Sequence, residues 1–208
     1  MNKQVLLIAS SNKGKIREIS DILKNFNLEI KTLEDFPEIK SPEETGKSFF
    51  ENAFLKAKYY AEKTGLLCLA DDSGLEVEAL NGAPGIYSSR FAGPSATDEE
   101  NNKKLLKELK DVPLEKRKAR FVCVIIVYHP SGKYIKTEGI WEGKIALEPK
   151  GDKGFGYDPL FLVPEYNFKK TVAELSLEEK NKLSHRARAL KKLLKILPQF
   201  LENLRNDK

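Results

Sequence analysis

The sequence predicts an α/β protein in which a mixed central β-sheet is flanked by helices. Short apolar runs typical of buried strands alternate with segments whose apolar residues recur at helical spacing. A strand, a helix and a strand follow one another at the start of the chain, which is typical of a parallel crossover. Later, a Pro-Ser-Gly turn joins two strand-like runs, which indicates an antiparallel hairpin.

The first elements are a strand, a helix and a second strand. Residues 4–10 (QVLLIAS) form a continuous apolar run too short for a helix, which predicts a buried strand, and residues 28–33 are predicted to form the second strand. Between them, apolar residues at helical spacing predict a helix: Ile16, Ile19, Ile22, Leu23 and Phe26. This order predicts that the two strands are parallel neighbours.

A capping pattern marks the next helix. Ser48 with Glu51 forms a capping-box pattern at its start, and Gly65 is a natural stop. Residues 66–70 (LLCLA) then predict a buried strand that runs directly into the sequence DDSG. We therefore expect DDSG to lie at the carboxyl end of a strand, where α/β sheets place their ligands.

The second half of the chain adds a helix, a hairpin and a final helix. Thr97 with Glu100 caps a helix, and residues 119–128 and 134–145 are the two strands of the hairpin. A last capping box, at residues 176–179, starts a long helix. The apolar stripe of this helix predicts that it continues until Pro198 breaks or kinks it.

Length and composition indicate a single globular domain. The chain has 208 residues, of which 40% are apolar, and we expect one domain, 1–208, with two lobes and no separate boundary. Its apolar runs are far shorter than the roughly 20 residues that cross a bilayer, and no leader pattern is present, so we expect a cytoplasmic protein. Cys68 and Cys123 lie in strand-like runs and are expected to be core residues, with no disulfide or metal role.

The charge of the chain favours an anionic partner. Its formal net charge is 36 − 31 = +5, which suits a nucleotide, phosphate or nucleic acid. Much of this charge lies in residues 180–195, a segment with seven basic residues and no acidic ones. A run of this kind usually forms a solvated helix face.

The first candidate site is the turn Ser10 to Lys15 (SSNKGK). A turn from strand to helix leaves backbone N–H groups free at the positive end of a helix, and its glycine allows close approach. Its two lysines add positive charge, and the alternative is a plain polar turn. The turn is not a Walker A loop, because Ala9 stands where that motif needs glycine and Ile16 where it needs Ser or Thr.

Acidic residues form the second candidate site. Asp71 and Asp72 are adjacent on an extended chain, so their side chains should point to opposite faces and do different jobs. One can bind a hard cation or act as a base, although an Asx-type turn is the ordinary alternative. Glu43 or Glu44 could complete a Mg²⁺ site whose other ligands are water and substrate oxygens.

The last two candidate sites are an aromatic loop and part of the basic helix. Glycines bracket Phe155 and Tyr157, which predicts either a platform that stacks a planar base or two core rings beside a turn. In the basic segment, His185 and Arg186 fall off the leucine stripe, so we expect them outside the core. Lys180 is one turn before Ser184 and can share its face.

Six motifs in order resemble one family over nearly the whole chain. The stretches are SSNKGK, EETG, ADDSGL, NGAPGIYSSRFAG, GFGYDPLF and EEKNKLSHRARAL, and they are similar to the inosine triphosphate pyrophosphatases, also called dITP/XTP pyrophosphatases. The resemblance implies Mg²⁺-dependent hydrolysis of ITP, dITP and XTP to the monophosphate and pyrophosphate by a homodimer. It also implies an elongated mixed sheet with a nucleotide cleft between two lobes, and it requires neither a membrane nor a nucleic acid.

The resemblance also implies roles for particular residues. Asp72 would be the catalytic base and a metal ligand, with Glu43 as the other metal ligand in preference to Glu44. Substrate contacts would come from the phosphate turn, from the residue after Asp72, from the aromatic loop and from the basic helix: Ser10, Ser11, Asn12, Lys13, Gly14, Lys15, Ser73, Phe155, Gly156, Tyr157, Asp158, Lys180, His185 and Arg186.

Discrimination between purines follows from the donors and acceptors of the base edge. A 6-keto purine presents an acceptor at O6 and a donor at N1, the reverse of adenine. His185 and Arg186 as donors, with Asp158 as an acceptor, would therefore stay unpaired against adenine. The competing hypothesis is a basic nucleic-acid-binding protein without turnover, which would need no acidic residues of this kind.

Overall fold

A six-stranded sheet organises the protein, with strands in the order β2-β1-β3-β4-β5-β6. The strands are β1 (Gln4–Ile8), β2 (Leu28–Thr32), β3 (Leu67–Val77), β4 (Lys118–Tyr128), β5 (Tyr134–Ile145) and β6 (Phe161–Leu162). β1 is parallel to β2 and β3, whereas β5 is antiparallel to β6, so the predicted mixed sheet is confirmed. This computed structural model describes residues 3–206, and the outermost two residues at each end of the predicted 1–208 domain lie outside the described part.

Five α-helices accompany these strands in residues 3–206. They are α1 (Lys13–Leu23), α2 (Phe49–Thr64), α3 (Asp98–Glu108), α4 (Leu177–Leu183) and α5 (His185–Asn206). Ser48 accepts from the Glu51 N–H at the start of α2, and Gly65 ends that helix with a φ of 69°, which favours glycine. In the described range, no helix is long and apolar enough to cross a bilayer.

The chain divides into two compact units. Unit 1 consists of Met1–Asp72, Cys123–Gly139 and Arg186–Lys208, and unit 2 consists of Ser73–Val122 and Ile140–His185. Both units are discontinuous in sequence, because β3, β4 and β5 each contribute residues to both. The single domain with two lobes stays a prediction.

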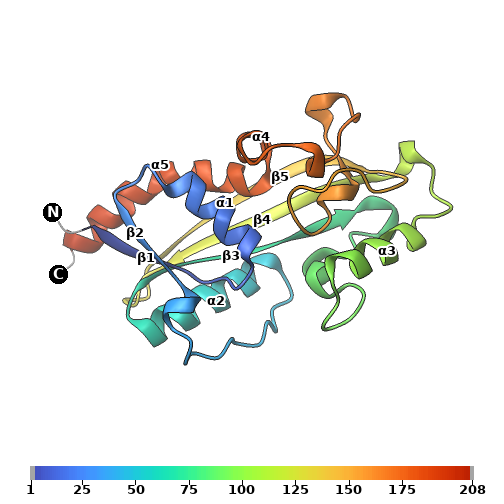
Figure 1. Cartoon of the computed structure of the whole chain (residues 1–208). Helices are drawn as coiled ribbons and strands as arrows, with labels where there is room; N and C mark the ends of the chain where they lie inside the picture. Colours follow the sequence, from blue (N-terminus) through green and yellow to red (C-terminus); the bar gives the residue numbers. More distant parts are fainter. Residues whose placement is uncertain (1–2, 207–208) are drawn as a thin grey trace. The chain divides into compact units, whose positions relative to one another are not determined.

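Unit 1 packs helices on both faces of its part of the sheet. Figure 1 shows α1 and α5 over one face and α2 over the other. The first face carries a core of alternate strand residues, including Leu67 and Leu69 of β3, packed against Ile19 of α1 and Leu190 of α5. Because side chains alternate along a strand, Asp71 continues the Leu67 and Leu69 face. Asp72 therefore points to the α2 face.

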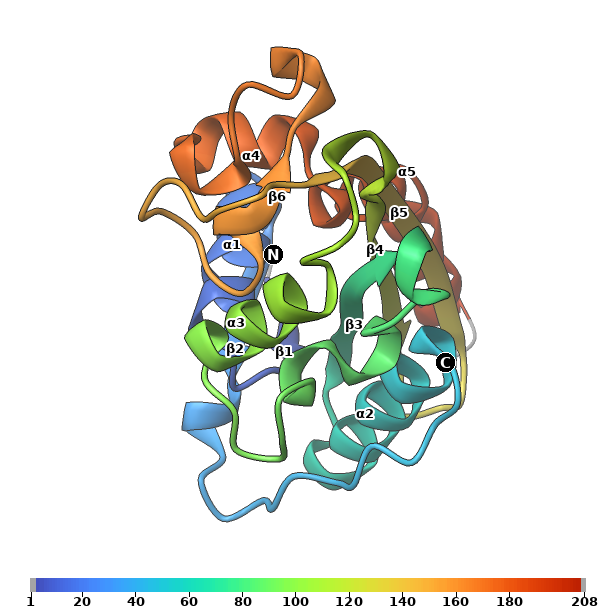
Figure 2. The same cartoon turned by 90° about the vertical axis from the view of Figure 1, so that its right-hand side faces the viewer.

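Unit 2 has its own core, centred on Trp141 and Phe161. Its helix α3 begins with the predicted capping box, in which Thr97 and Glu100 satisfy each other's backbone N–H groups. Asn101 of α3 accepts from the Ala92 N–H and donates to the Ser89 carbonyl, so α3 lies beside the helical segment Gly85–Arg90 (Figure 2). Hydrogen bonds from Asn101 therefore hold the segment around Ser89 and Ala92 against α3.

Two predictions about element boundaries are wrong. DDSG lies inside β3 and not at its end, because Leu75 and Val77 are buried and extend the strand. The final helix is two helices, since Ser184 has an extended backbone (ψ 159°) between α4 and α5. Pro198 does not break the helix, because it lies inside α5, where the nearby Leu197 and Phe200 are both in the unit 1 core; a kink at Pro198 stays a prediction.

Candidate active site

The predicted phosphate turn connects β1 to α1. Asn12 is the N-cap of α1, where its side chain accepts from the Lys15 N–H at 3.1 Å. The Ser10 hydroxyl in turn accepts from the Asn12 N–H at 3.1 Å. Ser11, Asn12 and Lys13 are exposed, and the first turn of α1 contains no acidic residue. The positive end of this helix is therefore open to an anion.

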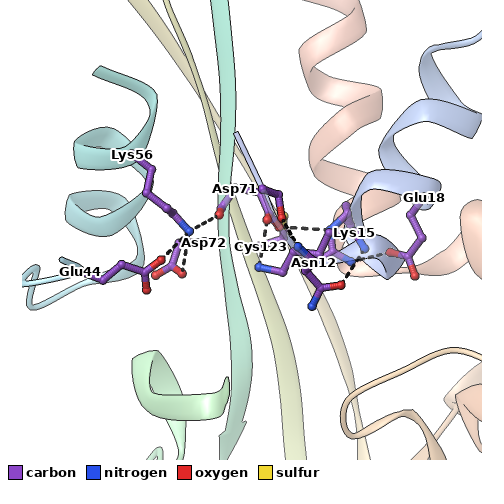
Figure 3. Close-up of polar contacts among 10 residues, drawn as sticks. Asn12, Lys15, Glu18, Glu44, Lys56, Asp71, Asp72 and Cys123 are labelled. Atoms are coloured by element: carbon purple, nitrogen blue, oxygen red, sulfur yellow. Dashed lines mark hydrogen bonds and ion pairs between the residues drawn. The ribbon is translucent and has the colours of Figure 1, made fainter. Parts of the chain in front are cut away.

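Five side chains of unit 1 form a buried polar group around Asp71, named here the Asp71 cluster. Lys15 pairs with Asp71 Oδ1 at 3.0 Å, and Arg186 Nε donates to Asp71 Oδ2 at 3.1 Å. Arg186 also pairs with Glu18 of α1, and the Cys123 thiol donates to Asp71 Oδ2 at 3.4 Å. The cluster contains two cations and two carboxylates, so its formal charge balances. Figure 3 shows it on the α1 side of β3.

Asp71 is held in its charged form. Burial alone opposes ionisation, but Lys15 and Arg186 outweigh it and keep the pKa of Asp71 well below its usual range. A carboxylate that is tied to two cations is a poor proton acceptor. Asp71 is therefore a structural counter-ion of Lys15 and Arg186.

Asp72 occupies a different environment on the opposite side of β3. Lys56 of α2 lies 2.9 Å from Glu44 Oε1 and 3.7 Å from Asp72 Oδ1, and it donates to the Asp71 carbonyl at 2.8 Å. We name Glu44, Lys56 and Asp72 the Lys56 cluster (Figure 3). Burial raises the pKa of Asp72 to about 6, although Lys56 and Lys15 oppose the shift. A carboxylate with this pKa is suited to take up a proton near neutral pH.

The Lys56 cluster provides the donor set that a hard cation needs. Asp72 Oδ2 is buried and has no hydrogen-bond partner, so this oxygen is available to a ligand. Two carboxylates fit Mg²⁺, which usually keeps several waters and takes one or two protein carboxylates. Over residues 3–206 no group of three or more His, Cys, Asp or Glu side chains is arranged to hold a metal by itself.

The geometry favours Glu44 over Glu43 as the partner of Asp72. Glu44 is half-buried and pairs with Lys56, whereas Glu43 is exposed. The two acids are neighbours in one loop, so their spacing in the sequence could not separate them. Lys56, a helix residue 12 positions beyond Glu44, provides the distinction.

In unit 2, the loop Gly154–Asp158 is built around Asp158. This buried carboxylate pairs with Lys180 at 2.6 Å and accepts from the Phe155 N–H at 3.0 Å. Gly154 has a φ of 72°, and a Cβ there would come within 2.1 Å of Asp158 Oδ2. Lys180 also lies 4.5 Å from the centre of the Phe155 ring, as a cation–π contact. The loop therefore presents Phe155 in a defined position.

The predicted stacking platform does not hold for the ring of Tyr157. That ring lies in the unit 2 core, and its hydroxyl donates to the Ser88 carbonyl at 2.6 Å. Gly156 donates to Asp98 Oδ2 at 2.8 Å and accepts from the Asn102 amide at 3.0 Å. Phe155 is the half-buried ring of the pair. Tyr157 is therefore a core residue that anchors the loop.

The expectation that His185 and Arg186 lie outside the core is also wrong. Both are buried, as is Lys180. The reason is that the buried face of α5 includes Leu190 and Leu193, and Arg186 lies one and two turns before them on the same face. His185 stacks on Phe121 of unit 2, with ring centres 4.7 Å apart.

The remaining predicted residues are placed by their elements. Ser73 follows Asp72 in β3 and is half-buried, and Gly14 lies in the first turn of α1. Sequence reasoning missed Lys56 and Glu18. The available signal for each was weak: Lys56 is a lysine between the buried Ala53 and Ala57 of one helix, and Glu18 is an acid directly before the core residue Ile19.

Comparison with known proteins identifies the family. The model of the Ham1 family matches residues 6–196. The chain belongs to the Ham1 family. This membership confirms the resemblance that the six motifs indicated. The match leaves only the ends of the chain outside the family model.

Individual relatives of this Ham1-family chain cover nearly its whole length. It is 50% identical over 200 residues to a dITP/XTP pyrophosphatase from Bacillus cereus, which covers 95% of this chain and 96% of the relative. It is 52% identical over 192 residues to a dITP/XTP pyrophosphatase from Desulforamulus reducens, with 92% and 94% covered. Among solved structures, a HAM1 protein from Coxiella burnetii matches with a TM-score of 0.85 and 42% identity, over 94% of this chain and 99% of that one.

Proposed function

We propose that this Ham1-family chain hydrolyses the non-standard purine nucleoside triphosphates ITP, dITP and XTP to the monophosphate and pyrophosphate. The observation that carries the proposal is the contrast between two adjacent carboxylates. Asp71 is locked as the counter-ion of Lys15 in the phosphate turn, while Asp72 has a pKa of about 6 and one unpaired oxygen. The relatives at about half identity, which are dITP/XTP pyrophosphatases, supply the substrate class.

The phosphate turn would bind the triphosphate. The exposed N-terminus of α1 offers free N–H groups, and Lys13 and Lys15 add charge against the phosphate oxygens. Hydrolysis between the α- and β-phosphates leaves pyrophosphate, whose developing charge these groups would neutralise. The turn would therefore bind the substrate and assist departure of the product.

Asp72 would act as the general base. Its carboxylate takes a proton from the attacking water, whose oxygen then bonds to the α-phosphorus as the bond to the leaving pyrophosphate oxygen breaks. We propose Mg²⁺ as the cofactor, held by Asp72 and Glu44, where it would supply positive charge against the triphosphate oxygens. The exposed position of Glu43 is the reason for preferring Glu44 to the glutamate favoured by the resemblance.

For recognition of the purine base, the proposed residues are among those that the family resemblance implies. We propose that Phe155 stacks on the purine and that His185 and Asp158 serve its polar edge. Arg186, which is buried and paired with Asp71 and Glu18, is not part of this proposal. Buried groups left unpaired against adenine would discriminate by up to about 10⁴-fold. A homodimer and a cytoplasmic location also stay predictions.

The competing function, nucleic-acid binding without turnover, has less support from the basic segment. Lys180 is neutralised by Asp158, and Arg186 by Glu18 and Asp71. A solvated basic face needs free cations, and these two are buried and paired. The segment therefore has fewer charges available for a phosphate backbone than its composition indicates.

A nucleotide panel tests the proposed function. The protein is incubated with Mg²⁺ and, separately, ITP, dITP, XTP, ATP and GTP, and monophosphate and pyrophosphate are quantified. We expect kcat/KM for ITP, dITP and XTP to exceed that for ATP and GTP by at least about 100-fold, because unpaired base-recognition groups penalise the wrong purine. Equal turnover of all five, or release of single phosphates, would contradict the proposal.

A further inference from the structure

Lys56 occupies the point where oxygens from three residues converge. Its ammonium contacts Glu44 Oε1 at 2.9 Å, the Asp71 carbonyl at 2.8 Å and Asp72 Oδ1 at 3.7 Å. The side chain is only 14% exposed. The ammonium of Lys56 therefore lies between two acids and pairs with both.

The oxygens that Lys56 contacts are also those proposed for the divalent cation. Glu44 and Asp72 are the carboxylates of that donor set, and Lys56 contacts both. Two cations repel each other strongly at short range in a partly buried site. The ammonium and a divalent ion held by the same two carboxylates therefore exclude each other.

We propose that Lys56 is a resident counter-cation that competes with the divalent metal for Glu44 and Asp72. Metal binding then requires Lys56 to leave the carboxylates, which frees its ammonium to pair with another anion. This inference rests on the proposed function, in which that anion is the nucleotide triphosphate. By linkage, a nucleotide that takes up Lys56 tightens metal binding, and the metal tightens nucleotide binding by the same factor.

The same helix provides a matched control. Lys58 lies two residues further along α2, is exposed, and pairs with Glu62 at 3.8 Å. Neutralising Lys58 removes the same charge from the same helix, yet leaves the Lys56 cluster intact. Any general effect of lowering the protein's positive charge will therefore appear in both variants.

The first experiment measures Mn²⁺ binding without nucleotide, using the electron paramagnetic resonance signal of free Mn²⁺. We expect Lys56→Met to bind Mn²⁺ about 10-fold more tightly than the parent. In the parent, Mn²⁺ can bind only the fraction of sites that Lys56 has left, and this lowers the apparent Mn²⁺ affinity of the parent. Lys58→Met should stay within about 2-fold of the parent. Binding by Lys56→Met that is unchanged or weaker would overturn the proposal.

A second substitution tests whether the same carboxylates are involved. In the Lys56→Met background, Glu44→Gln should abolish the gain in Mn²⁺ affinity, because it removes one of the two carboxylates. Glu43→Gln, the neighbouring exposed acid, should preserve the gain. A gain that survives Glu44→Gln would overturn the assignment of the competition to this pair.

The second experiment uses the unmodified protein, so it does not depend on the folding of a variant. Lysines are acetylated briefly with and without saturating Mg²⁺, and each site is quantified by mass spectrometry. Release from its carboxylates should raise the labelling rate of Lys56 at least about 3-fold, while Lys58 stays constant. Unchanged labelling of Lys56 would overturn the proposal.

Neither readout requires turnover. Competition between Lys56 and the metal can therefore fail while the protein still releases pyrophosphate from ITP, and the proposed function would stand. Conversely, positive metal-binding results with no pyrophosphate release would overturn the proposed function alone.

Discussion

Asp71 and Asp72 are adjacent in the chain, yet they differ in everything that decides their chemistry. The alternation of β3 turns Asp71 to Lys15 and Arg186, and turns Asp72 to Lys56. Two direct ion pairs keep Asp71 charged, whereas burial raises the pKa of Asp72 because its single, longer contact with Lys56 opposes the rise only in part. The sequence predicted opposite faces and different roles, but it could not identify the partners of each acid.

The role of Asp72 is tested by Asp72→Asn. We expect kcat for ITP to fall by about 10²–10⁴-fold with a small change in KM, because the amide cannot take up the proton from water. Steady-state pyrophosphate release measures both constants. Asp21→Asn is a matched control, since Asp21 is a surface acid of α1 that pairs with Lys24. A near-normal kcat in Asp72→Asn would remove this residue from the mechanism.

At the scale of elements, the turn from β1 to α1 is the best example of local prediction. Its apolar strand, polar turn and helical periodicity are all encoded within residues 4–26. The structure adds the cap, in which Asn12 accepts from the Lys15 N–H. This bond fixes the first turn of α1 and therefore the direction of its free N–H groups.

Asn12→Ala tests this element. Loss of the cap should lower the free energy of unfolding by about 1 kcal/mol and raise KM for ITP, because the anion-binding turn loosens. Ser48→Ala is the matched control: it removes the equivalent cap of α2, so stability should fall similarly while KM stays unchanged. Urea denaturation and steady-state kinetics provide the two measurements. An equal KM effect in both variants would contradict a special role for the α1 cap.

The junction of α4 and α5 is the element that local patterns described least well. One leucine stripe and one capping box predicted one helix with exposed basic residues. The structure instead breaks this helix at Ser184, and Lys180, His185 and Arg186 are all buried. Each finds a partner that is distant in sequence: Asp158, Phe121 and Asp71 respectively. Helical periodicity carries no information about such partners.

At the scale of the whole molecule, the two cysteines report on global unfolding. Cys68 and Cys123 are buried and free, as predicted. Burial raises the pKa of both thiols, so neither forms a thiolate in the folded chain at ordinary pH. Cys123 also donates to Asp71, which the expectation of a plain apolar role did not include.

Thiol labelling tests this arrangement. We expect neither cysteine to react with a disulfide reagent in the native protein at pH 8, and both to react in denaturant. Above the unfolded thiol pKa of about 8.5, the unfolded chain binds fewer protons than the folded one, so stability should fall as pH rises. Replacing both cysteines by alanine should flatten that slope between pH 8 and 10. Rapid native labelling would contradict the buried, protonated state.

The sequence by itself determined the first five strands, the first three helices, their main caps and the family. Apolar periodicity and capping boxes act over a few residues, and each of the six motifs is a short continuous stretch. All of these signals can therefore be recognised from neighbouring residues in the sequence. The tertiary structure alone decided which charges are paired. Arg186 meets Asp71 across 115 residues and Glu18 across 168, and Lys56 selects Glu44 over Glu43. Ion pairing and desolvation depend on distance in space, and this distance is set only when the chain has folded.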